Sequence, residues 1–515
     1  MTEAKRFTSG CVASPHHLAS AAGLEVLASD GNALDAAIAM NLTLGVVTPY
    51  FCGFGGDLFA MIWRGGVHAY NGSGRAPAGA TVDFVRRQSG SEEMPLFGPH
   101  SVTVPGAVEA WFRLLDRFGT RSFGDLARTA LRCARDGFVL SDRAATYIQR
   151  SRAVFRGEHD WLGAYSNAET GREFRQPGVA RTIENLSDAG PDAYYRGEIA
   201  EAIVGMLSAR GSAMTLGDLA EHEGEWVEPL RCDYHGYEVL EMPPNTQGVA
   251  ALEALQISEV TGASKEKGAA REHLLVEAMK LALSDRDRFV SDPAAMTIPA
   301  GRLLERAWIA ERGASIDASK AGKPPIGRPA RGGTAYMCAA DSSGMCVSLI
   351  QSNYVGFGSG VHVPGWGINL HNRGGYFSLD PSHVNAIEPR KRTLHTLIPA
   401  MVLRDGKPWL VFGTMGGDGQ AQTHLQLLTR IIDDGAGPQE AIDAPRWIVS
   451  PSDWAVATEP GFGKETLDRL VGYGHRVRVV EPLDTIMGHA QAILAGPGGF
   501  EAASDPRSEG AALGF

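Results

Sequence analysis

The chain is poor in cysteine and in positive charge, and each shortage excludes a class of protein. Six cysteines stand among 515 residues, and no two of them form a CxxC pair. Such spacing disfavours a zinc site and a disulfide framework, and it is typical of a reducing compartment. The 48 lysines and arginines are outnumbered by 59 acidic residues, which gives a net charge of −11. An acidic surface repels phosphate backbones, so we expect no nucleic-acid partner.

Hydrophobic runs of membrane length are also scarce. Residues 36–56 carry no charge, but they contain Asn41, Thr43, Pro49 and four glycines. This composition favours a buried helix running into a loop over a membrane span. No apolar segment follows the N-terminal MTEAKRFTSG, as a secretory signal would require. We therefore expect a cytoplasmic protein without a membrane partner.

Several familiar catalytic motifs are missing as well. The sequence has no G-x-S-x-G elbow, no Walker A loop and no HExxH pair. The glycines of GFGSG, at residues 356–360, lack the spacing of a dinucleotide fingerprint. These absences argue against the usual serine-hydrolase, nucleotide-binding and zinc-protease sites.

What is present is a globular composition, 44% hydrophobic and 21% charged. At roughly 150 residues per domain, the length fits two to four domains. Local patterns predict helices over residues 15–31, 32–47, 273–289 and 420–434. They predict strands over 58–63, 66–72, 237–242, 400–405, 408–413, 475–480 and 490–496. Two strand-like runs, 334–341 and 345–354, flank a short SSG turn and predict a β-hairpin.

Glycine is the abundant residue, with 63 copies, many of them in pairs. One pair, Gly332-Gly333, ends a segment (311–333) whose Gly, Pro, Ser and Lys content predicts an exposed, flexible linker. Thr334 follows it directly. If the peptide bond before Thr334 were cut, its hydroxyl would share a residue with a new α-amine of pKa near ~8. Such an amine can act as the base for a threonine nucleophile. From the residues alone, a plain β-turn entering a strand explains the junction equally well.

Motifs further along the chain resemble the γ-glutamyltranspeptidase family in order and spacing. They are GGTAYMCAAD, QSNYVGFGSG, PRKRTLHTLIPAMVLRDGKPW, GTMGGDG and EAIDAPRW. The first half resembles the same family in DGNALDAAIAMNLTLGVVTPYFCGFGGDLFAM and HLLVEAMKLALSDRDRFVSDP, and the C-terminal part in AASDPRSEGAALG. The resemblance covers most of the chain.

This resemblance implies an α/β (α+β) fold of the N-terminal-nucleophile type, a four-layer αββα sandwich. It implies self-cleavage between Gly333 and Thr334 into a large subunit, 1–333, and a small subunit, 334–515, which stay intertwined as one domain. Thr334 would attack an amide carbonyl of a small-molecule substrate, and Ser352 would hydrogen-bond this nucleophile. The N–H groups of Gly416 and Gly417 would stabilise the oxyanion. The implied mechanism needs no metal or cofactor.

The positions that read a γ-glutamyl group depart from the family pattern. Where the resemblance places an Asn, a Gln and an Asp around the substrate α-amine, the chain has Tyr354, Arg373 and Tyr376. Losing the anion and gaining a cation disfavours an ammonium group. We interpret Arg373 as the ligand of a carboxylate on a different acyl group; an exposed hairpin arginine is the alternative.

Other pocket positions also differ. Ser73 stands where an arginine would bind the α-carboxylate, and Arg75 lies two residues on. His395 and Thr396 replace two serines that flank the pocket. The segment between residues 377 and 389 is shorter than in relatives that carry a lid, which predicts an open pocket.

These features predict a self-processing threonine amidohydrolase in which hydrolysis dominates over transfer. Three alternatives stay open at this point. The first is a true γ-glutamyltransferase or glutathione hydrolase. The second is an amidohydrolase similar to cephalosporin acylase or to oxamate amidohydrolase. The third is an unprocessed, non-catalytic binding protein.

Overall fold

Two seven-stranded antiparallel sheets form the centre of the molecule. The structure is a computed structural model that describes residues 4–327 and 332–515. In spatial order, the first sheet contains β21 (Ala511–Gly514), β2 (Gly10–Ser14), β10 (Gly333–Asp341), β11 (Cys346–Tyr354), β3 (Asp57–Trp63), β4 (Val67–Gly72) and β7 (Glu225–Val227). The second contains β1 (Lys5–Phe7), β20 (Gly499–Ser504), β19 (Ala490–Gly496), β15 (Lys407–Thr414), β14 (Ala400–Arg404), β9 (Tyr237–Glu241) and β8 (Leu230–Tyr234).

The predicted hairpin at the junction is confirmed as the central pair of the first sheet. Strands β10 and β11 pair antiparallel, with Tyr336 opposite Ile350 and Cys338 opposite Ser348. Every residue of both strands is buried. Strand β10 is therefore covered on both faces. Its residues Tyr336 and Cys338 pack in the core between the sheets, whereas Met337 packs against helices outside.

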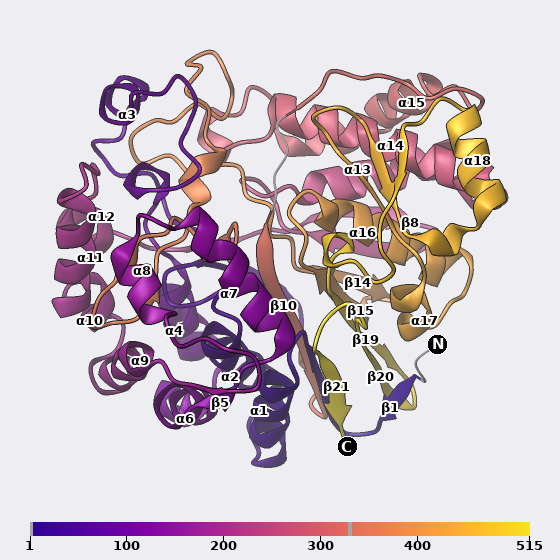
Figure 1. Ribbon diagram of the computed structural model, residues 1–515. Helices are drawn as coiled ribbons and strands as arrows, with labels where there is room; N and C mark the ends of the chain where they lie inside the picture. Colours follow the sequence, from indigo (N-terminus) through magenta and orange to yellow (C-terminus); the bar gives the residue numbers. More distant parts are fainter. Residues whose placement is uncertain (1–3, 328–331) are drawn as a thin grey trace.

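Helices cover the outer face of each sheet, so the four layers run helix, sheet, sheet, helix (Figure 1). The layer against the first sheet includes α1 (His17–Ala28), α2 (Ala33–Val47), α4 (Ala107–Phe118), α6 (Arg128–Asp136), α7 (Asp142–Val154), α9 (Pro177–Ala189) and α11 (Glu198–Ser208). The layer against the second includes α13 (Gly248–Val260), α14 (Gly268–Phe289) and α16 (Gly419–Leu428). The predicted αββα sandwich is confirmed.

Helix α2 explains the uncharged stretch of the sequence. All fifteen of its residues are buried, so the helix is apolar on every side because it lies inside the protein. Its first turn is closed by a capping box between Asn32 and Asp35. Within residues 4–327 and 332–515, no helix has the length and apolarity that a membrane crossing requires.

Three predicted boundaries differ from the structure. Ser14 does not begin a helix, because it pairs with Ala511 at the end of β2, and α1 instead starts after the N-cap His16. The helix predicted over 420–434 ends as α16 and continues as one π-helical turn, Thr429–Asp433. Helix α15 (Arg306–Ala314) extends into the predicted linker, of which residues 328–331 lie outside the described residues.

Candidate active site

Thr334 is the second residue of β10 and is almost wholly buried. Its hydroxyl donates a hydrogen bond of 3.3 Å to Ser352 Oγ on the neighbouring strand β11. Ser352 in turn donates to the carbonyl oxygen of Gly333 at 2.6 Å and accepts the N–H of Tyr354 at 2.7 Å. One serine hydroxyl therefore contacts both the hydroxyl of Thr334 and the carbonyl of the peptide bond that precedes it. The predicted pairing of Thr334 with Ser352 is present in the uncut chain.

Gly333 sits where a side chain has no room. A Cβ atom at this position would lie 2.8 Å from the carbonyl oxygen of Tyr50 and 3.0 Å from the ring of Phe51. Both neighbours belong to the loop after α2, and the contact with Tyr50 is to backbone, which cannot turn away. The close approach explains why glycine precedes Thr334.

Gly416 and Gly417 form the turn between β15 and α16, and both have positive φ, 143° and 58°. Glycine adopts such angles without a Cβ clash. Among the described residues, no acceptor atom forms a hydrogen bond with the N–H of either glycine. A Cβ at Gly332 would lie 3.4 Å from the N and Cα atoms of Gly417. The turn therefore lies beside the chain that leads into Thr334, with its donors available.

Two buried side chains that the sequence analysis did not single out hold this turn. Gln247 Nε2 donates to the carbonyl of Gly417 at 2.8 Å. Arg286 Nη1 donates to Gln247 Oε1 at 2.7 Å and to Asp418 Oδ1 at 2.6 Å. Arg286 belongs to the DRDRF run of α14, part of the family-like HLLVEAMKLALSDRDRFVSDP motif, so the motif was visible while its contact with the turn was not.

Arg373 is a buried cation and not an exposed hairpin residue. Its side chain, 1% exposed, lies in the turn Arg373–Tyr376 and donates from Nη1 to Thr396 Oγ1 at 3.2 Å. The guanidinium stacks over the ring of Tyr354, 4.1 Å from its centroid. Its Nε and Nη2 atoms have no hydrogen-bond partner among the described residues. Burial lowers the pKa of Arg373 to about 10, which still leaves the group charged at neutral pH.

Tyr354 and Tyr376 form the aromatic wall beside this arginine. Their rings meet edge to face with centroids 6.0 Å apart. Tyr354 has a φ of 76°, a left-handed conformation that is rare for a bulky residue. Such strain persists only where the surroundings impose it. Tyr354 therefore connects the residues around Thr334 with Arg373, because its N–H donates to Ser352 and its ring contacts the guanidinium of Arg373.

His395 belongs to a buried cluster of charged and titratable groups around Asp57. Its Nδ1 accepts the N–H of Leu397, so Nε2 carries the proton that it donates to Asp57 Oδ2 at 3.2 Å. Burial and the charge of Arg373 lower the pKa of His395 to about 3. Burial alone would raise the pKa of Asp57, but His371, His395 and Arg373 lower it to about 2. Asp57 follows the GFGG motif, and the sequence analysis did not assign it.

Ser73 and Arg75 have structural partners. The hydroxyl of Ser73 donates to Asn71 Oδ1 at 2.7 Å. Arg75 directs its guanidinium to Glu225 at 2.7 Å and to Asp292 at 3.3 Å. Both side chains are thus engaged within the protein, and their role as carboxylate ligands stays a prediction.

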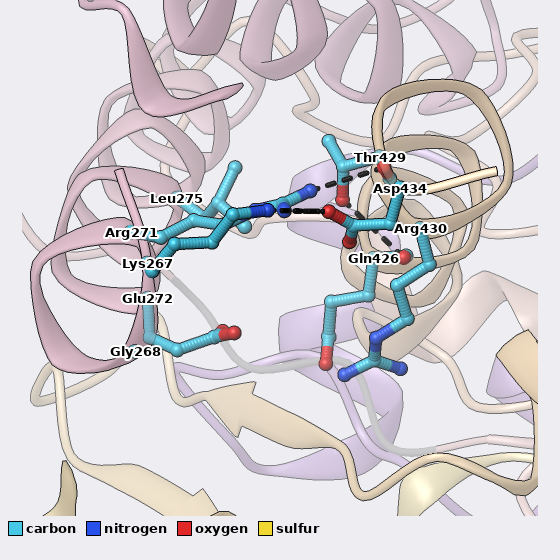
Figure 2. Close-up of a pocket in the computed structure, with 9 residues that line it drawn as sticks. All are labelled: Lys267, Gly268, Arg271, Glu272, Leu275, Gln426, Thr429, Arg430 and Asp434. Carbon is cyan, nitrogen blue, oxygen red and sulfur yellow. Dashed lines mark hydrogen bonds and ion pairs between the residues drawn. The ribbon is translucent and has the colours of Figure 1, made fainter. Parts of the chain in front are cut away.

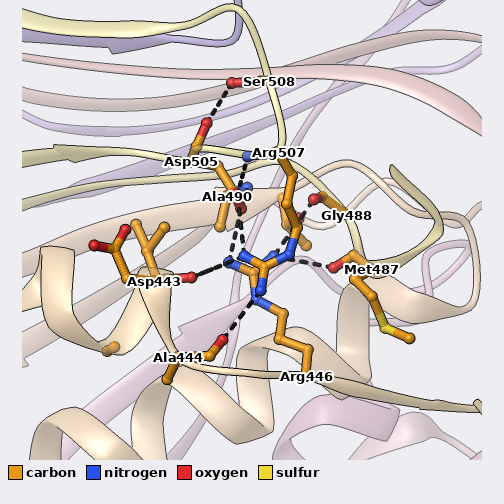
Figure 3. Close-up of polar contacts among 12 residues, drawn as sticks. Asp443, Ala444, Arg446, Met487, Gly488, Ala490, Asp505, Arg507 and Ser508 are labelled. Carbon is orange, nitrogen blue, oxygen red and sulfur yellow. Dashed lines mark hydrogen bonds and ion pairs between the residues drawn. The ribbon is translucent and has the colours of Figure 1, made fainter. Parts of the chain in front are cut away.

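Two family-like motifs near the C-terminus meet in a buried ion-pair network (Figure 3). Arg446, from EAIDAPRW, binds Asp505 Oδ2 at 2.7 Å, and Arg507 binds Asp505 Oδ1 at 3.2 Å. Arg446 also donates to the carbonyl of Met487 at 3.0 Å. A Cβ at the following Gly488 would lie 2.6 Å from the carbonyl oxygen of Met415. The network thus supports the segment that packs against the residue before Gly416.

A separate cavity of about 300 Å³ lies between the start of α14 and the π-helical turn (Figure 2). Arg271 and Lys267 both bind Asp434 there, at 2.6 Å and 3.0 Å. No residue that the sequence analysis predicted for the site lines this cavity. Glu272 accepts the indole N–H of Trp447 at 2.6 Å, and Arg430 donates to the carbonyl of Pro445 at 2.6 Å. The charged groups of the cavity are thus engaged within the protein, and we assign it no role.

Comparisons with known proteins agree with this geometry. A family model described as gamma-glutamyltranspeptidase matches residues 19–515. The glutathione hydrolase-like YwrD proenzyme of Bacillus subtilis (strain 168) is 39% identical, with 99% of both chains covered. The oxamate amidohydrolase proenzyme of Klebsiella pneumoniae is 37% identical, again with 99% of both covered. The crystal structure of a cephalosporin acylase from Bacillus halodurans superposes with a TM-score of 0.93 at 36% identity, covering 100% of this chain and 97% of that one.

The matches thus run the length of the chain, and the structural match agrees with the αββα layers. On these grounds the chain belongs to the γ-glutamyltranspeptidase family, whose members are hydrolases and acyltransferases of amide bonds.

Proposed function

We propose that the chain is a self-processing amidohydrolase with Thr334 as its nucleophile, and that it favours hydrolysis over transfer. The observation that carries the proposal is the contact of Ser352 with both the hydroxyl of Thr334 and the carbonyl of Gly333. In the uncut chain, the Ser352 hydroxyl is within hydrogen-bonding distance of both the Thr334 hydroxyl and the carbonyl oxygen of the peptide bond to be broken.

Maturation starts with attack of Thr334 Oγ1 on the carbonyl carbon of Gly333. The O–C bond forms, the C–N bond to Thr334 breaks, and the hydroxyl proton passes to the nitrogen. Ser352 polarises the carbonyl through its hydrogen bond of 2.6 Å. Water then hydrolyses the ester, which releases the carboxylate of Gly333 and the free α-amine of Thr334.

Catalysis repeats the same chemistry on a substrate amide. The α-amine, with a pKa near ~8, takes the proton of the Thr334 hydroxyl during attack. In this proposal the N–H groups of Gly416 and Gly417 bind the negative charge on the tetrahedral intermediate, a contribution of about 3–4 kcal/mol per donor. The amine leaves with a proton, an acyl ester remains on Thr334, and water releases the acid.

The acyl group should carry a carboxylate. Arg373 is buried and charged, and two of its donor atoms, Nε and Nη2, have no partner within residues 4–327 and 332–515. A carboxylate accepts such donors in pairs, which matches the fork of an arginine. Oxamate, the substrate in the name of one relative, is an amide with a carboxylate of this kind. An α-ammonium group would instead meet a like charge.

Hydrolysis should dominate because nothing long enough to form a lid follows Tyr376. The chain from Ser378 to Asn385 closes on itself through a hydrogen bond of 2.8 Å between Ser378 N–H and the carbonyl of Asn385. We infer that such a turn leaves the acyl ester open to water once the chain before Thr334 is cut.

The test is the intact mass of the purified protein after incubation, with N-terminal sequencing of the smaller fragment. The proposal expects a fragment that begins Thr-Ala-Tyr-Met and hydrolysis of a carboxylate-bearing amide. The Thr334→Ala variant should stay as one chain of 54.9 kDa. A wild-type chain that stays uncut would favour the non-catalytic alternative, and a variant that still matures would refute the nucleophile assignment.

A further inference from the structure

The segment before the junction is pinned to the protein although it has no regular structure. The N–H of Ala321 donates to the carbonyl of Tyr473 at 2.7 Å, and the N–H of Gly327 donates to that of Pro451 at 2.9 Å. The indole of Trp454 donates to the carbonyl of Pro324 at 2.8 Å. The partners all lie beyond Thr334 in the sequence. The segment Asp317–Gly327 therefore keeps its contacts with the small subunit when the bond before Thr334 is cut.

A buried ion pair on α14 holds the middle of this segment. Glu277 Oε2 accepts the N–H of Gly322 at 2.8 Å, and Lys280 Nζ donates to the carbonyl of Gly322 at 3.2 Å. The two side chains bind each other at 2.6 Å and are 5% and 2% exposed. The backbone of Gly322 is thus held at both its N–H donor and its carbonyl acceptor.

A relay of hydrogen bonds fixes the start of the segment. The carbonyl of Asp317 can only accept, so His273 Nε2 carries a proton and donates to it at 2.8 Å. His273 Nδ1 must then accept from His475 Nε2, 2.7 Å away. His475 Nδ1 is left as an acceptor for Lys280 Nζ at 3.5 Å. Each donor faces an acceptor, and burial lowers the pKa of His475 to about 3, which keeps the ring neutral as the relay requires.

The same residues have the spacing of a metal site, since ligand atoms of His273, Glu277 and His475 lie within 4.8 Å of one another. Two features speak against a metal ion here. The proton on His475 Nε2 points at His273, where a metal would need a lone pair. The ammonium of Lys280 already neutralises Glu277. We therefore interpret the cluster as a clamp on the segment.

The clamped segment forms one wall of a cavity of about 600 Å³. Tyr376 of the site lines it, together with an apolar set: Leu281, Val290, Leu394, Pro324, Pro325 and Ile326. Of its charged residues, Asp285 is paired with Arg312 at 2.6 Å, and Asp287 is paired with Arg286. Arg288 also lines the cavity, and its guanidinium lies 4.9 Å from the ring centroid of Phe289. A cavity of this size and lining suits an apolar group of aromatic size.

The chain's own cleavage indicates which half of a substrate the cavity receives. The ester formed from Gly333 and Thr334 during maturation is the same linkage as the acyl-enzyme, so the residues before Gly333 mark the acyl side. Gly327, in the cavity wall, is five residues from Gly332, which limits their separation to about 18 Å. The cavity is therefore within reach of a side group on the acyl half of the substrate, and Tyr376, which lines the cavity, also contacts the ring of Tyr354 beside Arg373.

We propose that the cleaved enzyme retains Asp317–Gly327 as a wall of this cavity, and that the cavity takes an apolar side group on the acyl half of the substrate. The proposal rests on the proposed function and narrows its substrate class. The substrate is a monoamide of a dicarboxylic acid whose carboxylate binds Arg373 and whose chain carries an aromatic-sized apolar group.

Digestion with trypsin tests whether the segment Asp317–Gly327 stays in place after maturation. Cleavage after Lys320 requires the hydrogen bonds of Ala321 and Gly322 to open first. The rate of this cut is measured by mass spectrometry for the matured wild type and for uncut Thr334→Ala. We expect the two rates to agree within twofold. A matured enzyme cut more than tenfold faster would overturn the retention of the wall.

Hydrolysis of p-nitroanilides tests the cavity. The substrates are the mono-anilides of malonic, succinic and glutaric acids, each with and without a benzyl group on its chain. We expect the benzyl group to raise kcat/KM at least tenfold for the best acid. Ile326→Trp, which narrows the cavity, should remove that gain. Val479→Trp, at an exposed site elsewhere, should keep both the gain and the rate with the unsubstituted anilides.

Rejection of the benzyl compounds, or an unchanged preference in Ile326→Trp, would overturn the cavity assignment. Failure of the proposed function gives a different result: an uncut chain, or a cut chain that hydrolyses none of the six anilides. In that case the inference falls together with the function.

Discussion

Ser352 Oγ lies 2.6 Å from the carbonyl oxygen of Gly333 and 3.3 Å from Thr334 Oγ1. The serine donates a hydrogen bond to the carbonyl that is attacked and accepts one from the hydroxyl that attacks it, so both contacts favour the reaction. Its third contact, the N–H of Tyr354 at 2.7 Å, fixes the hydroxyl between them. A hydroxyl with one proton and two lone pairs is then fully used.

Ser352→Ala should slow self-cleavage about a hundredfold, because a donor aimed at the reacting carbonyl is lost, comparable to the loss of one oxyanion donor. Ser352→Thr keeps the hydroxyl, so it should mature at a rate within about tenfold of the wild-type rate. The time course of the uncut band on a denaturing gel, checked by intact mass, measures both rates. Equal rates for Ser352→Ala and wild type would remove Ser352 from the mechanism.

Arg373→Met should raise KM for carboxylate-bearing amides by ten- to a hundredfold, as expected when a charge-assisted hydrogen-bond pair worth about 1.5–3 kcal/mol is lost. The pKa of about 10 keeps Arg373 charged across the neutral range, so the effect should not change between pH 6 and 8. An amide with an uncharged acyl group serves as the control and should keep its kcat/KM. Equal losses for both substrates would indicate a structural role for Arg373.

Arg373→Gln combined with Tyr376→Asp should give the enzyme γ-glutamyl hydrolysis. The first change removes a cation that repels the substrate ammonium, and the second adds an anion that pairs with it. Release of p-nitroaniline from γ-glutamyl-p-nitroanilide measures the gain. If the double variant matures and hydrolyses an amide with an uncharged acyl group but not this substrate, these two positions do not set the acyl specificity.

The sequence permitted a correct prediction of several elements whose structure is decided by a local pattern. The alternation in 334–354 predicted the hairpin that carries Thr334, and the uncharged run predicted the buried helix α2. Contacts between distant segments left no such pattern. Arg286 reaches Asp418 across 132 residues, and Asp57 meets His395 across 338. These pairs exist only because the two sheets bring their strands and helices together.

Asp505→Asn should destabilise the fold by about 3–5 kcal/mol, because it leaves buried arginines without their shared anion. Arg446 and Asp505 are both fully buried, at 2.7 Å. The matched control is Asp468→Asn, whose pair with Lys464 is as short, 2.5 Å, but largely exposed. That change should cost less than about 1 kcal/mol. Urea unfolding of both in the single-chain Thr334→Ala background compares them, and similar losses would contradict the role of burial.

His16 offers a pH-dependent test of the α1 N-terminus. Its Nδ1 accepts the N–H of Leu18 at 3.3 Å, which requires an unprotonated nitrogen. Burial, helped by the neighbouring His17, lowers the pKa of His16 to about 3, against about 6.5 in an unfolded chain. Between these values the unfolded chain binds a proton that the folded chain does not, so the stability that depends on neutral His16 falls as the pH drops below 6.5.

His16→Asn keeps a good N-cap acceptor but cannot be protonated. At pH 7.5 the variant and the parent should therefore have nearly equal free energies of unfolding. At pH 5.0 the variant should be more stable by about 2 kcal/mol. This pH is 1.5 units below the pKa of His16 in the unfolded parent, and proton binding there stabilises the unfolded state by about 1.4 kcal/mol per unit. Urea unfolding in the Thr334→Ala background at both pH values measures the difference. Other titrating groups are shared by the two proteins and cancel, so an equal difference at pH 7.5 and 5.0 would show that His16 does not carry this pH dependence.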